Sequence, residues 1–228
     1  MPFENFRRGQ KCGPIRPLDE TRGLLLIRDA APEDYAAYCR FFAEVNVSGD
    51  VADARAYEKH VVPRAFFGLE SGIPNAFLLW RPEGAVLHVT ILAVLPERRR
   101  RGLGRRMMLE AARRGRAHGL TRWQLNVHFE NVAAQVFYAK LGMAPAFESV
   151  LLELDVAIAK RFPVIQAGGT SARVVGQFGE PAPSVGADGS PARVRVEDDA
   201  ALVSELRAAG GVVLLRALRM VGEMPDTG

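Results

Sequence analysis

The chain has 228 residues, of which 48% are hydrophobic, and a formal net charge of +4 at pH 7. This content supports one sizeable core with a smaller second unit and excludes two full-sized domains. The segment from Arg98 to Arg116 contains nine arginines and one acidic residue, Glu110, so it carries +8 and the rest of the chain −4.

The location of this charge argues against a nucleic-acid binder. Such proteins spread basic residues over a face and interleave aromatic ones, whereas this run has no aromatic residue. Cys12 and Cys39 lack C-x-x-C or metal-ligand spacing, which predicts no metal site and a reducing cytoplasm. The N-terminus lacks a signal-peptide core, and no apolar run approaches the roughly 20 residues that cross a bilayer. We expect a cytoplasmic protein without membrane contact.

The first elements in chain order are an arm, a strand and two helices. Residues 1–20 mix Pro, Gly and charge without periodicity, which predicts an extended N-terminal arm. The segment GLLLIRDA from Gly23 predicts a short buried strand. A helix is expected to begin at Pro32, where two acidic residues suit the helix dipole, and a second short helix runs from Asp50 to about His60.

Three apolar runs follow, separated by the turn-type sequences GIPN and EGA, and they predict an antiparallel meander. The third run ends where the arginine cluster begins. A helical period then extends from Gly102 to His118 and leads into the strand TRWQLNVHF, so strand, helix and strand predict a parallel crossover.

The chain from Asn131 onward predicts two helices, a long loop and three strands. The helix is capped by Asn131 and ended by Gly142, and the strand FESVLLELDV follows it. Residues 159–192 are rich in Gly and Pro and predict a linker or long loop. Residues 193–222 predict strand, helix and strand. The final strand could complete the main sheet, cover an edge or bridge two subunits of a homodimer.

The arginine cluster begins with the segment RRRGLG at a junction between strand and helix. Backbone N–H groups at a helix N-terminus bind anions, and glycines let the backbone approach a phosphate closely. The spacing matches neither a Walker loop nor a dinucleotide-binding loop, because the latter needs a third glycine where Met107 stands. For Arg105, Arg106, Arg113, Arg114 and Arg116 we favour side chains that solvate the helix face, including i,i+4 pairs with Glu110.

Two motifs in this region resemble those of the GNAT acyltransferase superfamily. The first, [Q/R]-x-x-G-x-[G/A], has Arg99, Gly102 and Gly104 in its named positions. The second, N-x-x-A-x-x-x-Y-x-K-x-G-[FM], matches NVAAQVFYAKLGM, and its named positions hold Asn131, Ala134, Tyr138, Lys140, Gly142 and Met143. The resemblance covers residues 21–158, which we take as one acetyltransferase-like domain.

This resemblance implies an α/β (α+β) fold with a mixed, mostly antiparallel sheet flanked by helices, to which residues 193–222 add a small C-terminal appendage. It implies acetyl-coenzyme A as co-substrate and no metal. The pantetheine arm would pair with the backbone of the fourth strand. The expected cofactor-binding residues are Leu92, Ala93, Val94, Arg99, Arg100, Arg101, Gly102, Leu103, Gly104, Arg105, Asn131 and Tyr138.

The implied reaction is attack of a primary amine, on a small molecule or a protein, at the thioester carbonyl. The resemblance makes Tyr138 the acid that protonates the departing thiolate. An N–H near Val94, where we expect a bulge, would stabilise the oxyanion. We take His88 as the base, with His128 and Glu97 as rivals.

The acceptor is the least determined part of this prediction. Acids outnumber bases seven to four between residues 31 and 70, which mildly favours a cationic amine. The acids are Glu33, Asp34, Glu44, Asp50, Asp53, Glu58 and Glu70. Two alternatives of other classes are a non-catalytic acyl-coenzyme A-binding regulatory module and a nucleic-acid binder.

Overall fold

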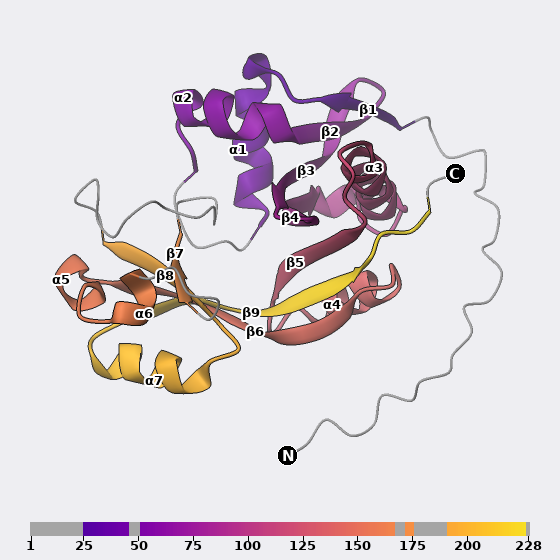
Figure 1. Ribbon diagram of the computed structural model, residues 1–228. Coiled ribbons are helices and arrows are strands. Elements are labelled where there is room, and N and C mark those ends of the chain that lie inside the picture. The colour runs from indigo at the N-terminus through magenta and orange to yellow at the C-terminus, as the bar shows by residue number, and fades with distance from the viewer. Residues whose placement is uncertain (1–24, 46–50, 167–171, 176–190, 227–228) are drawn as a thin grey trace, which may run out of the picture.

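The computed structural model describes residues 25–45, 51–166, 172–175 and 191–226. In this part of the chain nine strands form one sheet in the order β1-β2-β3-β4-β5-β9-β6-β8-β7 (Figure 1). The strands are β1 (Leu26–Asp29), β2 (Ala65–Glu70), β3 (Ile73–Glu83), β4 (Val86–Val94), β5 (Arg122–His128), β6 (Ala144–Leu154), β7 (Ala172–Val174), β8 (Ala192–Glu197) and β9 (Val212–Glu223).

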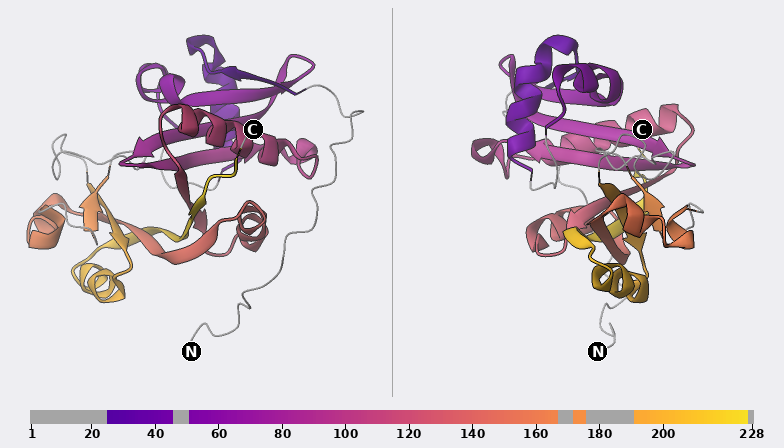
Figure 2. Two further views of the ribbon diagram at one scale, coloured as in Figure 1. Left: turned by 45° about the vertical axis from the view of Figure 1, so that its right-hand side comes forward. Right: turned by 90° about the vertical axis from the view of Figure 1, so that its left-hand side faces the viewer.

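Helices cover both faces of this sheet, as Figure 2 shows from two further directions. The α-helices are α1 (Tyr35–Ala43), α2 (Ala54–Ala56), α3 (Leu103–Ala117), α4 (Val132–Ala139), α5 (Val156–Ala159), α6 (Pro163–Gln166) and α7 (Ala200–Ala208). A π-helix continues α2, and short 3-10 helices precede α1, β2 and the loop before α3. The mixed, mostly antiparallel fold expected from the sequence is therefore confirmed.

The meander and the crossover are also confirmed. Strands β2, β3 and β4 pair antiparallel in sequence order, and β4 pairs parallel to β5 after the α3 connection. The predicted arm, residues 1–20, lies outside the described residues. The predicted linker contains α6 and the short strand β7, which pairs with β8 at one end of the sheet.

Strands β4 and β5 pair only over their first halves. Their register runs from Val86 opposite Arg122 to Val89 opposite Leu125, and no pair follows. A bulge in β4 lies where this pairing ends. Leu79 of β3 pairs with Ile91 and Trp80 pairs with Val89, so Thr90 between them has no paired residue on β3. The prediction of a bulge near Val94 is wrong, since Val94 lies in regular register with Ala76 and the bulge lies four residues earlier. We call the region beyond Val89, where β4 and β5 diverge, the split.

Strand β9 answers the question that the sequence left open about the C-terminal segment. It lies between β5 and β6 and pairs antiparallel with both. In Figure 1 this yellow strand runs alongside β6, which separates it in the sheet from the preceding strand β8. The last strand therefore completes the main sheet, and β8 extends that sheet by pairing with β6.

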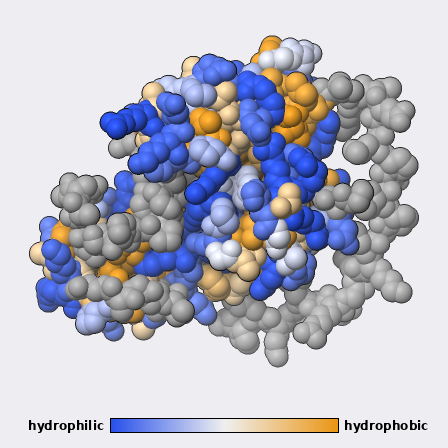
Figure 3. Space-filling view, turned by 45° about the horizontal axis from the view of Figure 1, so that its top comes forward, coloured by the Kyte–Doolittle hydropathy of each residue, from blue (hydrophilic) through white to orange (hydrophobic). Residues whose placement is uncertain are grey.

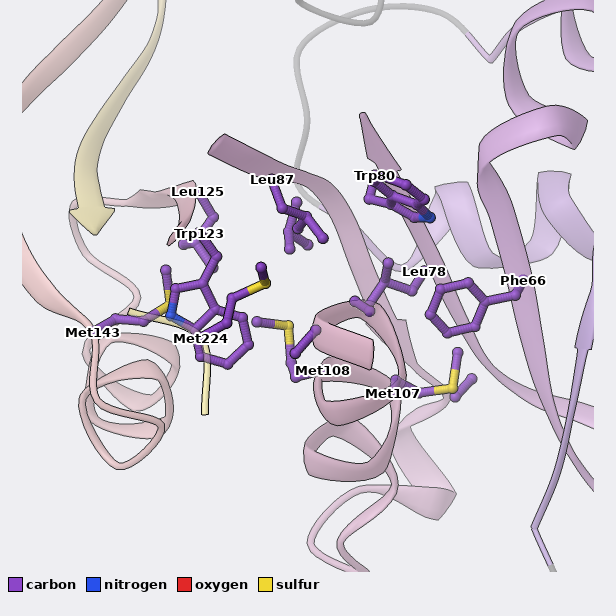
Figure 4. Packing of buried hydrophobic residues seen from close by; sticks show 14 of the residues in the cluster. Phe66, Leu78, Trp80, Leu87, Met107, Met108, Trp123, Leu125, Met143 and Met224 are labelled. Atoms are coloured by element: carbon purple, nitrogen blue, oxygen red, sulfur yellow. The ribbon is translucent and has the colours of Figure 1, made fainter. Parts of the chain in front are cut away.

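The largest core lies between the sheet and α3 (Figure 4). The helical line expected from the sequence, Leu103, Met107, Ala111 and Gly115, is buried along its whole length. In Figure 4 Met107 and Met108 project from α3 toward side chains of the sheet, and Met224 lies beside Trp123. A second cluster joins α1 and the π-helix to the opposite face of β2, β3 and β4, and a third joins α5, α6 and α7 to β6 and β8.

The end of β9 is held close to its neighbours. A Cβ atom on Gly222 would lie 2.7 Å from the carbonyl oxygen of Gly142 and 3.1 Å from Nε1 of Trp123. Just beyond, Arg116 of α3 donates to the carbonyl oxygen of Met224 at 2.5 Å. The chain that follows β9 is therefore attached to the C-terminal end of α3.

We predict that Gly222→Ala destabilises the protein by roughly 1–3 kcal/mol, because the methyl group would overlap a backbone oxygen that cannot move aside. Urea unfolding measures the change. The control is Glu223→Ala, since the neighbouring side chain is 74% exposed and its change should stay within about 0.5 kcal/mol. Equal stability of the two variants would contradict the close packing of β9.

Candidate functional site

The loop between β4 and α3 contains two residues with left-handed backbone. Arg100 has φ +63° and Gly102, the residue before α3, has φ +84°. An ordinary side chain costs about 1–2 kcal/mol in this conformation, so Gly102 suits its position on backbone grounds. Gly104 has no such backbone requirement, and a Cβ atom there would lie at an ordinary contact distance, 3.4 Å, from the ring of Phe137 on α4.

The backbone N–H groups at this loop are available to a ligand. No N–H from Arg100 to Arg105 donates to a described carbonyl, and the first backbone bond of the turn is that of Arg106 to Gly102 at 3.1 Å. The positive end of the dipole of α3 lies at the same place. Free N–H groups at a helix N-terminus are the arrangement that suits an anion, and this loop has it in its backbone alone.

The arginines around the loop fall into two groups. Arg100, Arg101 and Arg105 make no hydrogen bond or ion pair with any described residue. Arg99 is engaged, since its Nε donates to the carbonyl oxygen of Val94 at 2.9 Å and its Nη2 lies 3.2 Å from Glu44. Three cations thus remain available beside the free N–H groups.

Of the arginines that we expected to solvate the face of α3, some form the expected ion pairs and others do not. Arg113 and Arg114 both donate to Glu110 at 2.7 Å, and Arg114 also lies over the ring of Phe66. The expected pair of Arg106 with Glu110 is not formed, because Arg106 donates to the carbonyl oxygen of Leu25 at 3.2 Å. Arg106 therefore attaches α3 to the start of β1.

The split exposes one edge of β4 from Thr90 onward. The predicted cofactor-binding residues Leu92 and Val94 pack their side chains on the α3 core, whereas Ala93 is buried in the cluster on the opposite face. The backbone of this segment pairs with β3 on one side only. Its other edge is left for a ligand with its own donors and acceptors.

Helix α4 places Tyr138 against the core that contains Leu92 and Val94. Asn131 begins the helix, with its side-chain oxygen accepting from the N–H of Ala134 at 3.1 Å, and Gly142 ends it with φ +85°. Both predicted caps are confirmed. Burial raises the pKa of Tyr138 to about 12, so its phenol is protonated at neutral pH and can act as a donor.

The three candidate bases differ in their surroundings. Glu97 lies on the surface, with its side chain 59% exposed, and forms an ion pair with Arg40 at 3.4 Å. His88 is buried, with Nδ1 3.2 Å from Glu83, and burial lowers its pKa to about 3. His128 is the last residue of β5, in the part of the strand that no longer pairs with β4. It is half-buried, and its Nδ1 accepts from the N–H of Glu130 at 3.3 Å.

Several of the acids that suggested a cationic acceptor are engaged elsewhere. Asp34 accepts two hydrogen bonds from Arg28, at 2.6 and 2.7 Å, and Glu44 pairs with Arg99. Asp53 caps α2 by accepting from the N–H of Ala56 at 2.8 Å. Their charges thus have structural partners, which weakens the argument for a cationic acceptor.

Sequence reasoning missed a group of buried charged residues on the sheet face that carries α1. It includes Arg81 on β3, Arg195 on β8 and Arg219 on β9, each less than a tenth exposed. The available signal was arginine within apolar strands, at alternate positions in ARVRVE and singly in LLWR and ALRM. These strands are far apart in sequence, so their meeting could not be foreseen.

The surface shows few apolar areas on the side seen in Figure 3, where hydrophilic residues cover most of the described part and hydrophobic ones gather at the upper right. No helix among the described residues has the length and hydropathy to span a membrane. Nor do the described residues contain a group of three or more His, Cys, Asp or Glu side chains placed to hold a metal ion.

Comparison with solved structures shows the same fold in several acetyltransferases. A GCN5-related N-acetyltransferase from Sphaerobacter thermophilus aligns with a TM-score of 0.61 and 15% identity, covering 89% of this chain and 96% of that one. Ard1 from Thermoplasma volcanium aligns with a TM-score of 0.53 and 14% identity, covering 89% and 99%. The ribosomal-protein-S18-alanine N-acetyltransferase from Escherichia coli aligns with a TM-score of 0.51 and 14% identity, covering 90% and 97%.

Among curated proteins no significant match was found. The profile of the acetyltransferase (GNAT) family matches residues 35–143, which extend from α1 through the loop and α3 to the end of α4. This span contains both motifs and the split. The chain is therefore an acyltransferase of the GNAT superfamily.

Proposed function

We propose that the chain transfers the acetyl group of acetyl-coenzyme A to a primary amine of a small molecule or a protein. The observation that carries this proposal is the loop from Arg100 to Arg105, whose unengaged N–H groups lie directly after β4 and its exposed edge. Membership of the GNAT superfamily supplies the cofactor class.

The cofactor would be held in two parts. The N–H groups from Arg100 to Arg105 would bind the diphosphate, with three unpaired arginine side chains beside them. The amide-containing pantetheine arm would pair with the free edge of β4 at Leu92, Ala93 and Val94, as a strand pairs with a sheet edge. Such pairing brings the thioester into the split, beside the core that carries Tyr138.

In the reaction the amine nitrogen forms a bond to the acetyl carbon and the bond from carbon to sulfur breaks. Tyr138 donates its proton to the departing sulfur, giving the free thiol. Its raised pKa keeps the phenol protonated until that step. Asn131 contributes by setting the start of α4 and thereby the position of Tyr138.

The amine must lose a proton before or during attack, because an alkylammonium has a pKa of about 10.4. His88 fits this role poorly, since an imidazole whose pKa is lowered to about 3 holds a proton weakly. Glu97 is engaged with Arg40 on the outer surface. We therefore assign the base to His128, which lies on the unpaired part of β5 along the split, on the sheet face that also carries Asn126.

The loop arginines provide the first test. We predict that changing Arg100, Arg101 and Arg105 together to Ala weakens coenzyme A binding about tenfold or more at low salt, which is about 1.4 kcal/mol, because three unpaired cations leave the phosphate site. Calorimetry with coenzyme A measures the change. Arg113→Ala is the control, since that exposed side chain on the same helix pairs with Glu110; equal affinity of both variants would contradict the assignment.

The acid is tested by Tyr138→Phe. We predict a fall in kcat of about a hundredfold with coenzyme A affinity unchanged, because only the phenolic proton is removed. The readout is thiol release from acetyl-coenzyme A over a panel of amines. Tyr57→Phe is the control, because it removes a buried hydroxyl that donates a hydrogen bond to the carbonyl oxygen of Ala31, far from the split. Tight coenzyme A binding without turnover on any amine would favour a regulatory module instead.

The base is tested by His128→Gln beside His88→Gln. We predict that kcat at pH 7 falls ten- to a hundredfold in the His128 variant only. The loss should shrink as pH rises toward 10, because the amine then deprotonates without help. Circular dichroism checks that both variants fold. If the His88 variant alone loses turnover while folded, the assignment reverses.

A further inference from the structure

A cluster of charged and polar side chains occupies the sheet face opposite α3. Side chains alternate along a strand, and Leu87, Val89 and Leu125 belong to the α3 core, so His88 and Asn126 point to the other face. The same alternation places Arg173 of β7, Arg195 of β8 and Arg219 of β9 there. The acid-site cluster, as we name it, consists of Arg81, Glu83, His88, Thr90, Asn126, Arg173, Arg195, Glu197 and Arg219.

Contacts between the two halves of the sheet hold the cluster together. Arg173 of β7 lies 3.1 Å from Glu83 of β3 and 3.2 Å from Glu197 of β8. Arg219 of β9 pairs with Glu197, and its Nε donates to Asn126 at 2.8 Å. Strands β3 and β4 lie above and β7 and β8 below in Figure 1, so the cluster joins the two halves.

The cluster lies at the start of the split. Arg81 donates to the hydroxyl of Thr90 at 3.0 Å, and Thr90 is the bulge residue where β4 leaves β5. Asn126 is the first residue of β5 beyond the last pair with β4. Arg81 and Arg219 therefore border the opening in which the proposed reaction takes place.

The charges of the cluster do not balance. It contains four arginines and two glutamates, and His88 is neutral because burial lowers its pKa to about 3. Burial alone would raise the pKa of Glu83, yet its contacts with His88 and the arginines lower it, so the carboxylate is ionised. Counted over the described residues, the cluster has a net charge of about +2 in a largely buried space, which is costly unless an anion compensates it.

Arg195 is the side chain that lacks compensation most clearly. It is 8% exposed and makes no hydrogen bond or ion pair with any described residue. Burial and the neighbouring arginines lower its pKa to about 10, which still leaves it charged at neutral pH. A buried guanidinium has five donors to satisfy, so this position suits an acceptor that the described residues do not provide.

We propose that Arg195 and the acid-site cluster bind a carboxylate group of the amine acceptor, so that the substrate is an amino acid or another amine that carries an acid. This inference rests on the proposed function. The cofactor would occupy the α3 and α4 side of the split, which leaves the opposite face, where the cluster lies, for the acceptor.

The chemistry of the cluster favours a carboxylate over a phosphate or a cation. A guanidinium binds a carboxylate through two parallel hydrogen bonds. Glu83 and Glu197 would repel a dianion, while the surplus of arginine would repel the second ammonium group of a polyamine. A single negative charge is what the cluster accommodates.

The first experiment compares acceptors on the unchanged protein. Thiol release is measured with glycine, alanine and glutamate, with the amides of their α-carboxyl groups, and with putrescine. We predict that kcat/KM is at least tenfold higher for the acids than for the amides and putrescine. Equal use of acids and amides, or a preference for putrescine, overturns the inference while acetyl transfer itself remains shown.

The second experiment removes the guanidinium. We predict that Arg195→Met raises KM for the preferred acid at least tenfold, leaves KM for its amide within twofold and leaves coenzyme A affinity unchanged. Arg193→Met is the matched control, because Arg193 lies on the same face of β8 and is paired at 3.8 Å with Glu153. A rise in KM for the amide as large as that for the acid would overturn the assignment of Arg195.

A binding test separates failure of this inference from failure of the proposed function. Propionate, which carries a single carboxylate, should raise the melting temperature of the unchanged protein and of Arg193→Met, but not that of Arg195→Met. If no amine is acetylated although propionate stabilises the protein in this pattern, the carboxylate site stands and the proposed function fails. If Arg195→Met does not fold, the ratio of acid to amide turnover decides.

Discussion

The divergence of β4 and β5 after Val89 is the constraint on which the site depends. Two parallel strands that stay paired satisfy one another's backbone groups, and a ligand then finds no free edge. Here the bulge at Thr90 ends the pairing with half of β4 still to come. The exposed edge, the loop after it and the opening between the strands all follow from that one local irregularity.

The two faces of the sheet have different chemistry around this opening. On the side of α3 the ligand would meet backbone N–H groups, surface arginines and the neutral phenol of Tyr138. On the opposite side it would meet buried guanidinium groups beside the carboxylates of Glu83 and Glu197. A flexible, highly charged cofactor suits the first surface, and a small acceptor with a single anion suits the second. In the proposed arrangement the sheet would therefore separate the two substrates and let them meet only at the split.

Strand β9 connects these features. It supplies Arg219 to the acid-site cluster and Met220 to the α3 core from adjacent positions, since successive side chains of a strand point to opposite faces. Its close approach to Gly142 at Gly222 also fixes the end of the turn that follows α4. The C-terminal segment is thus part of the same sheet that carries the proposed catalytic residues.

The sequence by itself determined the features that depend on neighbouring residues. The meander, the crossover, the caps at Asn131 and Gly142 and the loop motif around Gly102 are local patterns of turn, period and backbone freedom, and each is found as expected. Only the tertiary structure decided where β9 pairs, where β4 bulges and what surrounds His88. The buried arginines come from strands up to 138 positions apart, from Arg81 to Arg219, and no local pattern encodes their meeting. Their charges become costly only when the folded sheet removes them from water together, because a buried cation needs an anion to offset the loss of its hydration.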